Sequence, residues 1–127
     1  MAIKYNVIEK GEPGVKGGGT KRFYASAITA GESDIEVLTS RIEKISTVSG
    51  ADIRAVLYAL VDVMTDELAE GRIVRLGELG NMRVSLSSEG MAKPEEVTAA
   101  NITNTRILFA PGNMLKNMLK TLTFQKA

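Results

Sequence analysis

Side chains that commonly carry out catalysis or bind metals are scarce in this chain of 127 residues, which contains no cysteine and no histidine. Zinc sites built from thiolates or imidazoles, cysteine nucleophiles and histidine general bases are therefore excluded. Asp, Glu and Lys are present, but no motif pairs them for acid–base catalysis. The sequence therefore predicts no catalytic residue, no metal site, no cofactor and no small-molecule substrate.

The glycine-rich stretch GVKGGGTK, residues 14–21, has the composition of a phosphate-binding loop. In a P-loop, a Gly-Lys-Ser/Thr sequence leads directly into a helix. Here Thr20 precedes Lys21, and a strand-like run follows. This order disfavours nucleotide binding.

The next stretch, KRFY at residues 21–24, alternates cations with aromatics, as proteins that bind single-stranded nucleic acid do. A structural interpretation is favoured, because apolar residues alternate on both sides of the glycine-rich loop. They are Ile3, Tyr5 and Val7 before it, and Phe23, Ala25 and Ala27 after it. This alternation predicts two strands that extend or cover a sheet edge.

Length and composition indicate one domain with a modest core, since 44% of the residues are apolar. No apolar run is long enough for a signal peptide or a spanning helix, so we expect a soluble cytoplasmic protein with no membrane contact. The net charge of +1 is unevenly distributed, because residues 33–71 are strongly acidic and both flanking segments are mildly basic. This pattern fits either a basic binding face or an ordinary solvated surface.

Two helices are predicted in the middle of the chain. Ser33 and Glu36 form a capping-box pattern that predicts the first helix start, and Ser49 precedes the second helix, which Gly71 ends. The apolar stripe of the second helix is broader than one packing surface requires. We therefore predict a homodimer whose interface contains Ile53, Val56, Leu57, Leu60, Val61 and Met64.

Beyond Gly71 the apolar period changes to two. The segment 73–76 predicts a short strand, the glycines at 77 and 80 predict a turn, and residues 82–86 predict a second strand. The stretch SSEGMAKPEEVTAAN, residues 87–101, predicts a projecting connection to a third strand over 102–110. Pro111 suits the first turn of a final helix.

These segments resemble the bacterial HU and integration host factor family of DNA-bending proteins. GRIVRLGELGNM, residues 71–82, resembles that family's glycine-containing hairpin, and ILFAPGNMLKNML, residues 107–119, resembles its closing strand and C-terminal helix. Residues 38–71 resemble its two dimerising helices. RFYASAITAGESDIEVL, residues 22–38, resembles the HU-related proteins of Bacteroides, in which an N-terminal extension precedes the core.

The resemblance implies an α+β fold of two helices, a three-stranded antiparallel sheet with a projecting β-arm, and a C-terminal helix, in an intertwined dimer. We expect residues 33–127 to form this HU-like domain and residues 1–32 to form a β-hairpin-like extension. The resemblance also implies an architectural protein of the bacterial nucleoid that binds double-stranded DNA with little sequence specificity.

The resemblance further implies which residues contact DNA. Arg83 and Arg106 lie where the family's sheet faces DNA, and Lys116 and Lys120 lie where its last helix binds phosphates. Lys93 and Pro94 match the arm tip, where the family inserts a proline between base pairs. The arm differs in charge, because Glu95 and Glu96 follow Pro94 directly. Acidic groups oppose phosphate binding.

Three function classes follow from these observations. The resemblance favours an architectural DNA-binding homodimer. The acidic arm favours the alternative, a structural or protein-interaction module that keeps the fold with weak or lost DNA binding. An enzyme is disfavoured, because no group of residues suits acid–base catalysis.

Overall fold

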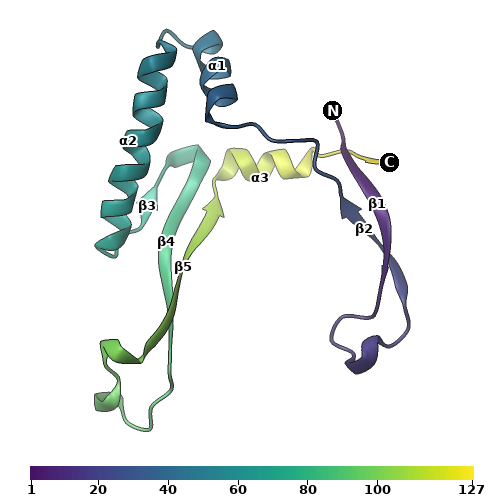
Figure 1. The fold of residues 1–127 in the computed structure, drawn as a ribbon, viewed down its shortest axis with the longest axis vertical. Coiled ribbons are helices and arrows are strands. Elements are labelled where there is room, and N and C mark those ends of the chain that lie inside the picture. The colour runs from purple at the N-terminus through teal and green to yellow at the C-terminus, as the bar shows by residue number, and fades with distance from the viewer. The chain divides into compact units, whose positions relative to one another are not determined.

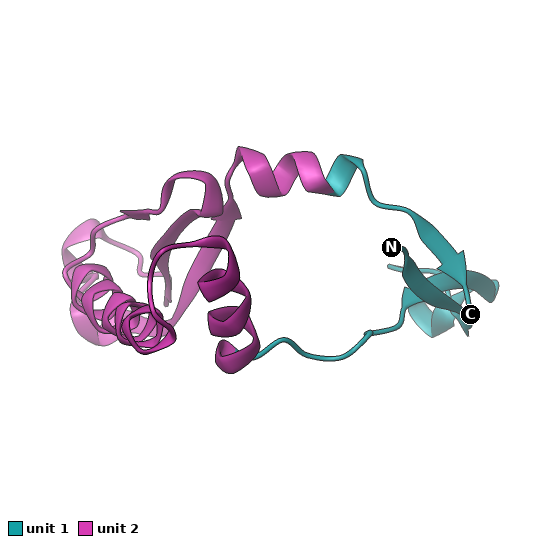
Figure 2. Ribbon diagram, turned by 90° about the horizontal axis from the view of Figure 1, so that it is seen from above, with its two compact units in different colours: residues 1–34, 119–127 teal, residues 35–118 magenta.

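The computed structural model describes residues 1–127 and divides them into two compact units, which Figures 1 and 2 show. Unit 1 comprises residues 1–34 and 119–127, and unit 2 comprises residues 35–118. The chain contains three α-helices and two three-stranded sheets, with one sheet in each unit. The predicted α+β class is therefore confirmed.

The first two helices of unit 2 are α1, Ile35–Ile45, and α2, Gly50–Ala69. They form a helical hairpin, in which α1 is drawn in blue and α2 in teal in Figure 1. The helix α1 begins one residue later than an N-cap at Ser33 would place it. At the start of α2 the prediction is confirmed, because the Ser49 side chain accepts a hydrogen bond from the backbone nitrogen of Asp52 at 3.3 Å.

The end of α2 is determined by Gly71. This glycine has φ +81°, and its backbone N–H donates to the Leu68 carbonyl at 3.0 Å. The next N–H, of Arg72, donates to the Glu67 carbonyl at 3.1 Å. These two bonds make a Schellman motif, which explains why the helix stops where the sequence predicts.

The sheet of unit 2 contains β3, Val74–Arg75, β4, Gly80–Ser88, and β5, Ile102–Pro111, all antiparallel in that order. A 3-10 turn over Gly77–Leu79 joins β3 to β4. Gly77 and Gly80 have φ values of +58° and +133°, and a side chain on Gly80 would collide with the Ala110 carbonyl. Both glycines are therefore needed for the turn.

The last helix, α3, spans Asn113–Lys120. The prediction that Pro111 lies in its first turn is wrong, because Pro111 is the last residue of β5 and pairs with Gly80. Proline is tolerated there because β5 is an edge strand, where the N–H that proline lacks is not needed for a ladder hydrogen bond. Gly112 separates the strand from the helix, and its N–H donates to the Leu79 carbonyl at 3.2 Å.

Beyond the body of unit 2, β4 and β5 continue together as a two-stranded arm, drawn in green in Figure 1. Its tip is the loop 89–101, which is closed by a hydrogen bond from the Glu89 nitrogen to the Asn101 carbonyl at 2.9 Å. The loop contains two 3-10 turns, Pro94–Glu96 and Ala99–Asn101.

Unit 1 is built on a second sheet with strand order β2-β1-β6. Strands β1, Ile3–Lys10, and β2, Arg22–Ala27, pair antiparallel, and β6, Phe124–Lys126, pairs parallel with β1. Residues 119–127 therefore group with the N-terminal extension, whereas the sequence interpretation placed them in the HU-like domain. Backbone pairing between β1 and β6 causes this difference.

The core within a single chain is small. Ile53 and Leu68 of α2 and Thr39 of α1 are the only buried residues with side chains larger than hydrogen. Large apolar side chains on α2, β4 and β5 remain substantially exposed. One chain alone thus leaves much apolar surface in water.

Candidate nucleic-acid interface

The register of the β3-β4-β5 sheet separates polar from apolar side chains. Residues directly opposite one another share a face, and alternate residues along a strand point to opposite faces. One face, which we call the arginine face, combines polar residues with two small or apolar ones. Its members are Arg75, Asn81, Arg83, Ser85, Ser87, Asn104, Arg106, Leu108 and Ala110. Apolar residues dominate the other face, which contains Val74, Met82, Val84, Leu86, Thr105, Ile107 and Phe109.

Two predicted DNA contacts, Arg83 and Arg106, lie together on the arginine face. Arg83 is opposite Leu108, and Arg106 is opposite Ser85. The two arginines are therefore diagonal neighbours, a relationship that separates residues by roughly 7–8 Å. Both side chains are exposed, so the register brings two available guanidinium groups to adjacent positions.

A third arginine, Arg75, joins this face. It pairs with Asn81 of β4, which pairs with Ala110 of β5. The sequence analysis named neither Arg75 nor the nearby Arg72 as a DNA contact. The alternation within residues 73–76 was a signal that could have separated them, because Arg75 lies in the strand and Arg72 precedes it.

All charged side chains on the arginine face are positive. The face carries three arginines and no acidic residue, and none of the three forms a salt bridge. Arg72 differs, because its Nη1 lies 3.1 Å from Glu67 Oε2. An unpaired guanidinium keeps all its donors available for a phosphate, which it can bind in a bidentate manner.

The other predicted phosphate contacts, Lys116 and Lys120, lie four residues apart on α3 and so share a side of that helix. Neither forms a salt bridge. The helix is held at its first turn by Glu78, whose Oε2 accepts a hydrogen bond from the Met114 nitrogen at 3.1 Å. A side chain from the β3–β4 turn thereby positions the lysine-bearing helix.

The remaining predicted contacts, Lys93 and Pro94, lie at the arm tip, beyond the arginine face. Lys93 has an extended backbone, and Pro94 begins a 3-10 turn that also contains Glu95 and Glu96. Glu89 closes the same loop. The tip therefore carries one cation and three carboxylates, so its net charge is negative, whereas that of the arginine face is positive.

The predicted dimer residues differ in their exposure. Ile53 is buried within this chain, so it belongs to its internal packing. Val56 and Leu60 are 64% and 36% exposed, and Val63, at helical spacing from both, is 58% exposed. The other predicted residues are Val61, which is exposed, and Leu57 and Met64, which are half-buried.

A hollow of about 260 Å³ lies beside the exposed stripe of α2. Its lining is apolar apart from one hydroxyl side chain, and the lining residues are Ile42, Ser46, Val48, Ile53, Val56 and Leu57. The hollow has the size and the character to receive an apolar side chain.

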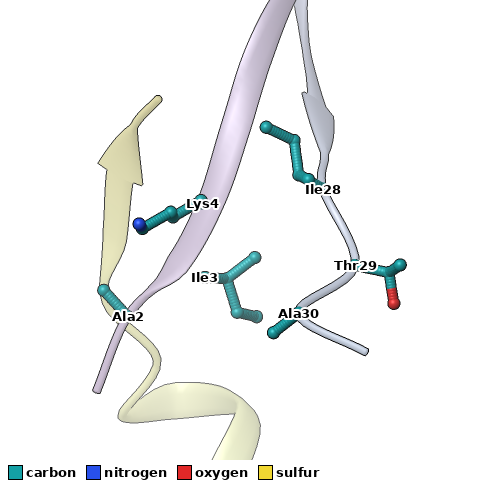
Figure 3. Close-up of a pocket in the computed structure, with 6 residues that line it drawn as sticks. All are labelled: Ala2, Ile3, Lys4, Ile28, Thr29 and Ala30. Carbon is teal, nitrogen blue, oxygen red and sulfur yellow. The ribbon is translucent and has the colours of Figure 1, made fainter. Parts of the chain in front are cut away.

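Another hollow lies in unit 1, has a volume of about 600 Å³ and is drawn in Figure 3. The figure shows Ile3 pointing toward Ala30, while the Lys4 side chain leaves β1 in another direction. The lining contains one amine, one hydroxyl and no carboxylate. Elsewhere, no group of three or more Asp and Glu residues gathers in a metal-binding arrangement. None of the three helices combines the length and apolarity that crossing a bilayer requires.

Comparisons with known proteins agree with this architecture. Residues 1–126 match the family model described as HU-HIG, an HU domain fused to a wHTH, Ig or glycine-rich motif. No curated protein matches the chain.

Two solved structures are similar. The crystal structure of a candidate DNA-binding protein from Bacteroides vulgatus ATCC 8482 has a TM-score of 0.68 at 16% identity, covering 98% of this chain. This chain spans about half of that protein, 48% of its length. A cocrystal structure of Anabaena HU with DNA has a TM-score of 0.54 at 15% identity, covering 70% of this chain and 99% of that one. The predicted resemblance is thus confirmed, and the chain belongs to the HU-HIG family of HU-related proteins.

Proposed function

We propose that this chain is an architectural protein of the bacterial nucleoid that binds double-stranded DNA as a homodimer. The observation that supports this function best is the arginine face, where Arg75, Arg83 and Arg106 lie on one side of the sheet and no strand residue of that side is acidic. Lys116 and Lys120 add two cations on α3.

Phosphate binding is the chemistry that these groups can supply. Each cation that neutralises a phosphate releases condensed counterions, so affinity falls as the salt concentration rises. In a symmetric dimer the five cations would be present twice. That number of charges is enough to hold a duplex at low salt without contact to the bases.

The binding is largely independent of sequence. The face distributes its arginines and asparagines over three strands, whereas base readout in the major groove uses bidentate pairs aimed at successive bases. A two-stranded arm that meets the minor groove encounters a nearly uniform set of acceptors. We expect similar affinity for a duplex and for its shuffled counterpart of equal composition.

The homodimer supplies the apolar packing that one chain lacks. Val56, Leu60 and Val63 form an exposed stripe on α2, next to the apolar hollow between α1 and α2. Covering this stripe with a second copy removes apolar area from water at about 25 cal/mol per Å². The extensive exposure of apolar side chains supports an interlocked dimer in which neither chain is stable alone.

A second candidate function is a protein-interaction module, favoured by the charge of the arm tip. The tip carries Glu89, Glu95 and Glu96 against Lys93. This charge would repel the negative potential of the minor groove and would attract a basic protein surface.

Titration of a short duplex at several salt concentrations tests the DNA-binding function. We expect Arg83→Ala and Arg106→Ala each to weaken binding and to lower the slope of log K against log salt by about 0.9 per lost phosphate contact. Arg72→Ala is the matched control, because Arg72 lies off the arginine face and is paired with Glu67. Binding by the unmodified chain that does not depend on salt, or equal losses in the control, would contradict the proposal.

A further inference from the structure

Unit 1 carries a second cationic sheet face, separate from the arginine face. In the β2-β1-β6 sheet, Lys10 pairs with Arg22, Ile8 with Tyr24, Asn6 with Ser26, and Lys4 with Gln125. These eight residues share one side of the sheet. We call this side the lysine face. Its strand residues include three cations and no carboxylate.

Lys10 and Arg22 are directly opposite one another on this face. Like charges in that relationship destabilise a strand pair. They are only partly compensated, because Arg22 Nε lies 3.5 Å from Glu12 Oε1 in the loop, and Lys10 Nζ lies 4.9 Å from the centre of the Tyr24 ring. The sheet therefore keeps a pair of like charges at opposing positions, a type of local conflict that is expected at functional sites.

The opposite face of the same sheet has a different character. It carries Ile3, Tyr5, Val7, Glu9, Phe23, Ala25, Ala27, Phe124 and Lys126. The only carboxylate of the strands, on Glu9, thus points away from the lysine face. The register therefore places three cations on the lysine face, and one cation and one carboxylate on the opposite face.

The positions of the aromatic rings indicate which part of a nucleic acid this surface suits. Phe23 is 70% exposed but lies on the opposite face, and Lys10 covers the ring of Tyr24. Binding to single strands needs cations and free rings on one surface, where bases can stack. Here the cations have no free ring beside them, so a phosphate backbone fits this surface better than unstacked bases do.

We propose that the lysine face binds the phosphodiester backbone of duplex DNA through Lys4, Lys10 and Arg22. This inference extends the proposed function, since it adds a contact surface outside the arginine face. The same chain joins the two faces, so once one of them is bound the other meets DNA at a raised effective concentration. The extension then contributes affinity as well as structure.

The experiment uses the full chain and a fluorescent duplex at several salt concentrations. We expect Lys4→Ala and Lys10→Ala each to weaken binding and to lower the salt slope by about 0.9. Arg22→Ala should have a smaller effect, because Glu12 already pairs with Arg22. Lys10→Arg keeps the charge and should bind as the unmodified chain does. Thermal unfolding is measured in parallel, and Lys10→Ala should retain its melting temperature because it removes a repulsive pair.

Lys126→Ala is the matched control, because it removes the same charge from the same sheet on the opposite face. If Lys4→Ala and Lys126→Ala weakened DNA binding equally, the effect would depend on net charge alone, and the inference would be overturned. If the lysine-face variants bound DNA as the unmodified chain does while Arg83→Ala bound more weakly, the inference would be overturned and the proposed function would stand.

The converse result, with weakened lysine-face variants and silent arginine-face variants, would support this inference and overturn the proposed site. Absence of any duplex binding by the unmodified chain would overturn both. If the unmodified chain bound single-stranded DNA more tightly than the duplex, and Lys10→Ala lost that preference, the lysine face would bind unstacked bases. That result would contradict the inference.

Discussion

Glu78 and Met114 are 36 residues apart in sequence, yet Glu78 Oε2 accepts a hydrogen bond of 3.1 Å from the Met114 backbone nitrogen. The carboxylate thus satisfies one of the free N–H groups in the first turn of α3 and complements the positive end of the helix. Because α3 carries Lys116, the turn between β3 and β4 positions a candidate DNA contact.

Replacing Glu78 should therefore loosen α3. We expect Glu78→Ala to lower the free energy of unfolding by about 1 kcal/mol, the usual value of an N-terminal cap. Urea denaturation followed by circular dichroism measures the change. Glu78→Gln keeps an acceptor oxygen and should lose less. Equal stability of all three chains would show that the capping bond contributes nothing.

The corner between β3 and β4 should tolerate no side chain at Gly80. This residue has φ +133°, and an added Cβ would meet the Ala110 carbonyl. We expect Gly80→Ala to lower the free energy of unfolding by more than about 1 kcal/mol. Gly90→Ala is the control, since Gly90 has open space around it and no positive φ. Similar melting temperatures for both variants would refute this view of the corner.

The buried hydroxyl of Thr39 is expected to cost stability. Thr39 is 1% exposed, and its Oγ1 has no hydrogen-bond partner. Thr39→Val replaces the hydroxyl with a methyl group of similar size and should raise the free energy of unfolding by about 1 kcal/mol. Thr65→Val serves for comparison, because the Thr65 hydroxyl is exposed and donates to the Val61 carbonyl at 2.8 Å. A destabilised Thr39→Val chain would indicate a partner for this hydroxyl in the assembled protein.

The proposed dimer predicts that a charge on the exposed stripe of α2 prevents assembly. Val56→Asp should dissociate the dimer and unfold much of the chain, since interlocked dimers often lack a stable monomer. Light scattering and circular dichroism measure both effects. Ala55→Asp adds the same charge on the side of α2 that carries Asp62 and Asp66, and should be tolerated. A folded monomer of the unmodified chain at micromolar concentration would disprove the dimer.

Substitutions at the arm tip and on the arginine face should affect DNA bending differently. Because the tip carries three carboxylates and one lysine, we expect Pro94→Ala to change binding and bending little. Arg83→Ala and Arg106→Ala should weaken both. Fluorescence transfer between the ends of a labelled duplex reports bending. Loss of bending in Pro94→Ala with silent arginine variants would show that the proline acts despite the acidic residues around it.

Local features of this fold are predictable from the sequence. Ser49 caps α2 through a bond to a backbone nitrogen three residues away, and Gly71 ends the helix through bonds that span five residues or fewer. Such contacts close small loops and depend on side-chain type and backbone freedom alone. Gly77 belongs to the same class, because its φ of +58° is a local requirement of the turn.

Tertiary structure decides the features that depend on pairing between distant segments. Arg75 joins Arg83 only because β3 pairs with β4 in one particular register, and a slip of one residue would turn it to the other face. Phe124 pairs with Ile3 although the two residues lie near opposite ends of the sequence, so no local pattern indicates the β6–β1 pair. Side-chain type and spacing thus determined the two ends of α2, the glycine turn after it and its broad apolar stripe. Strand register and the pairing of the two ends, which depend on contacts between distant residues, determined which cations share a face.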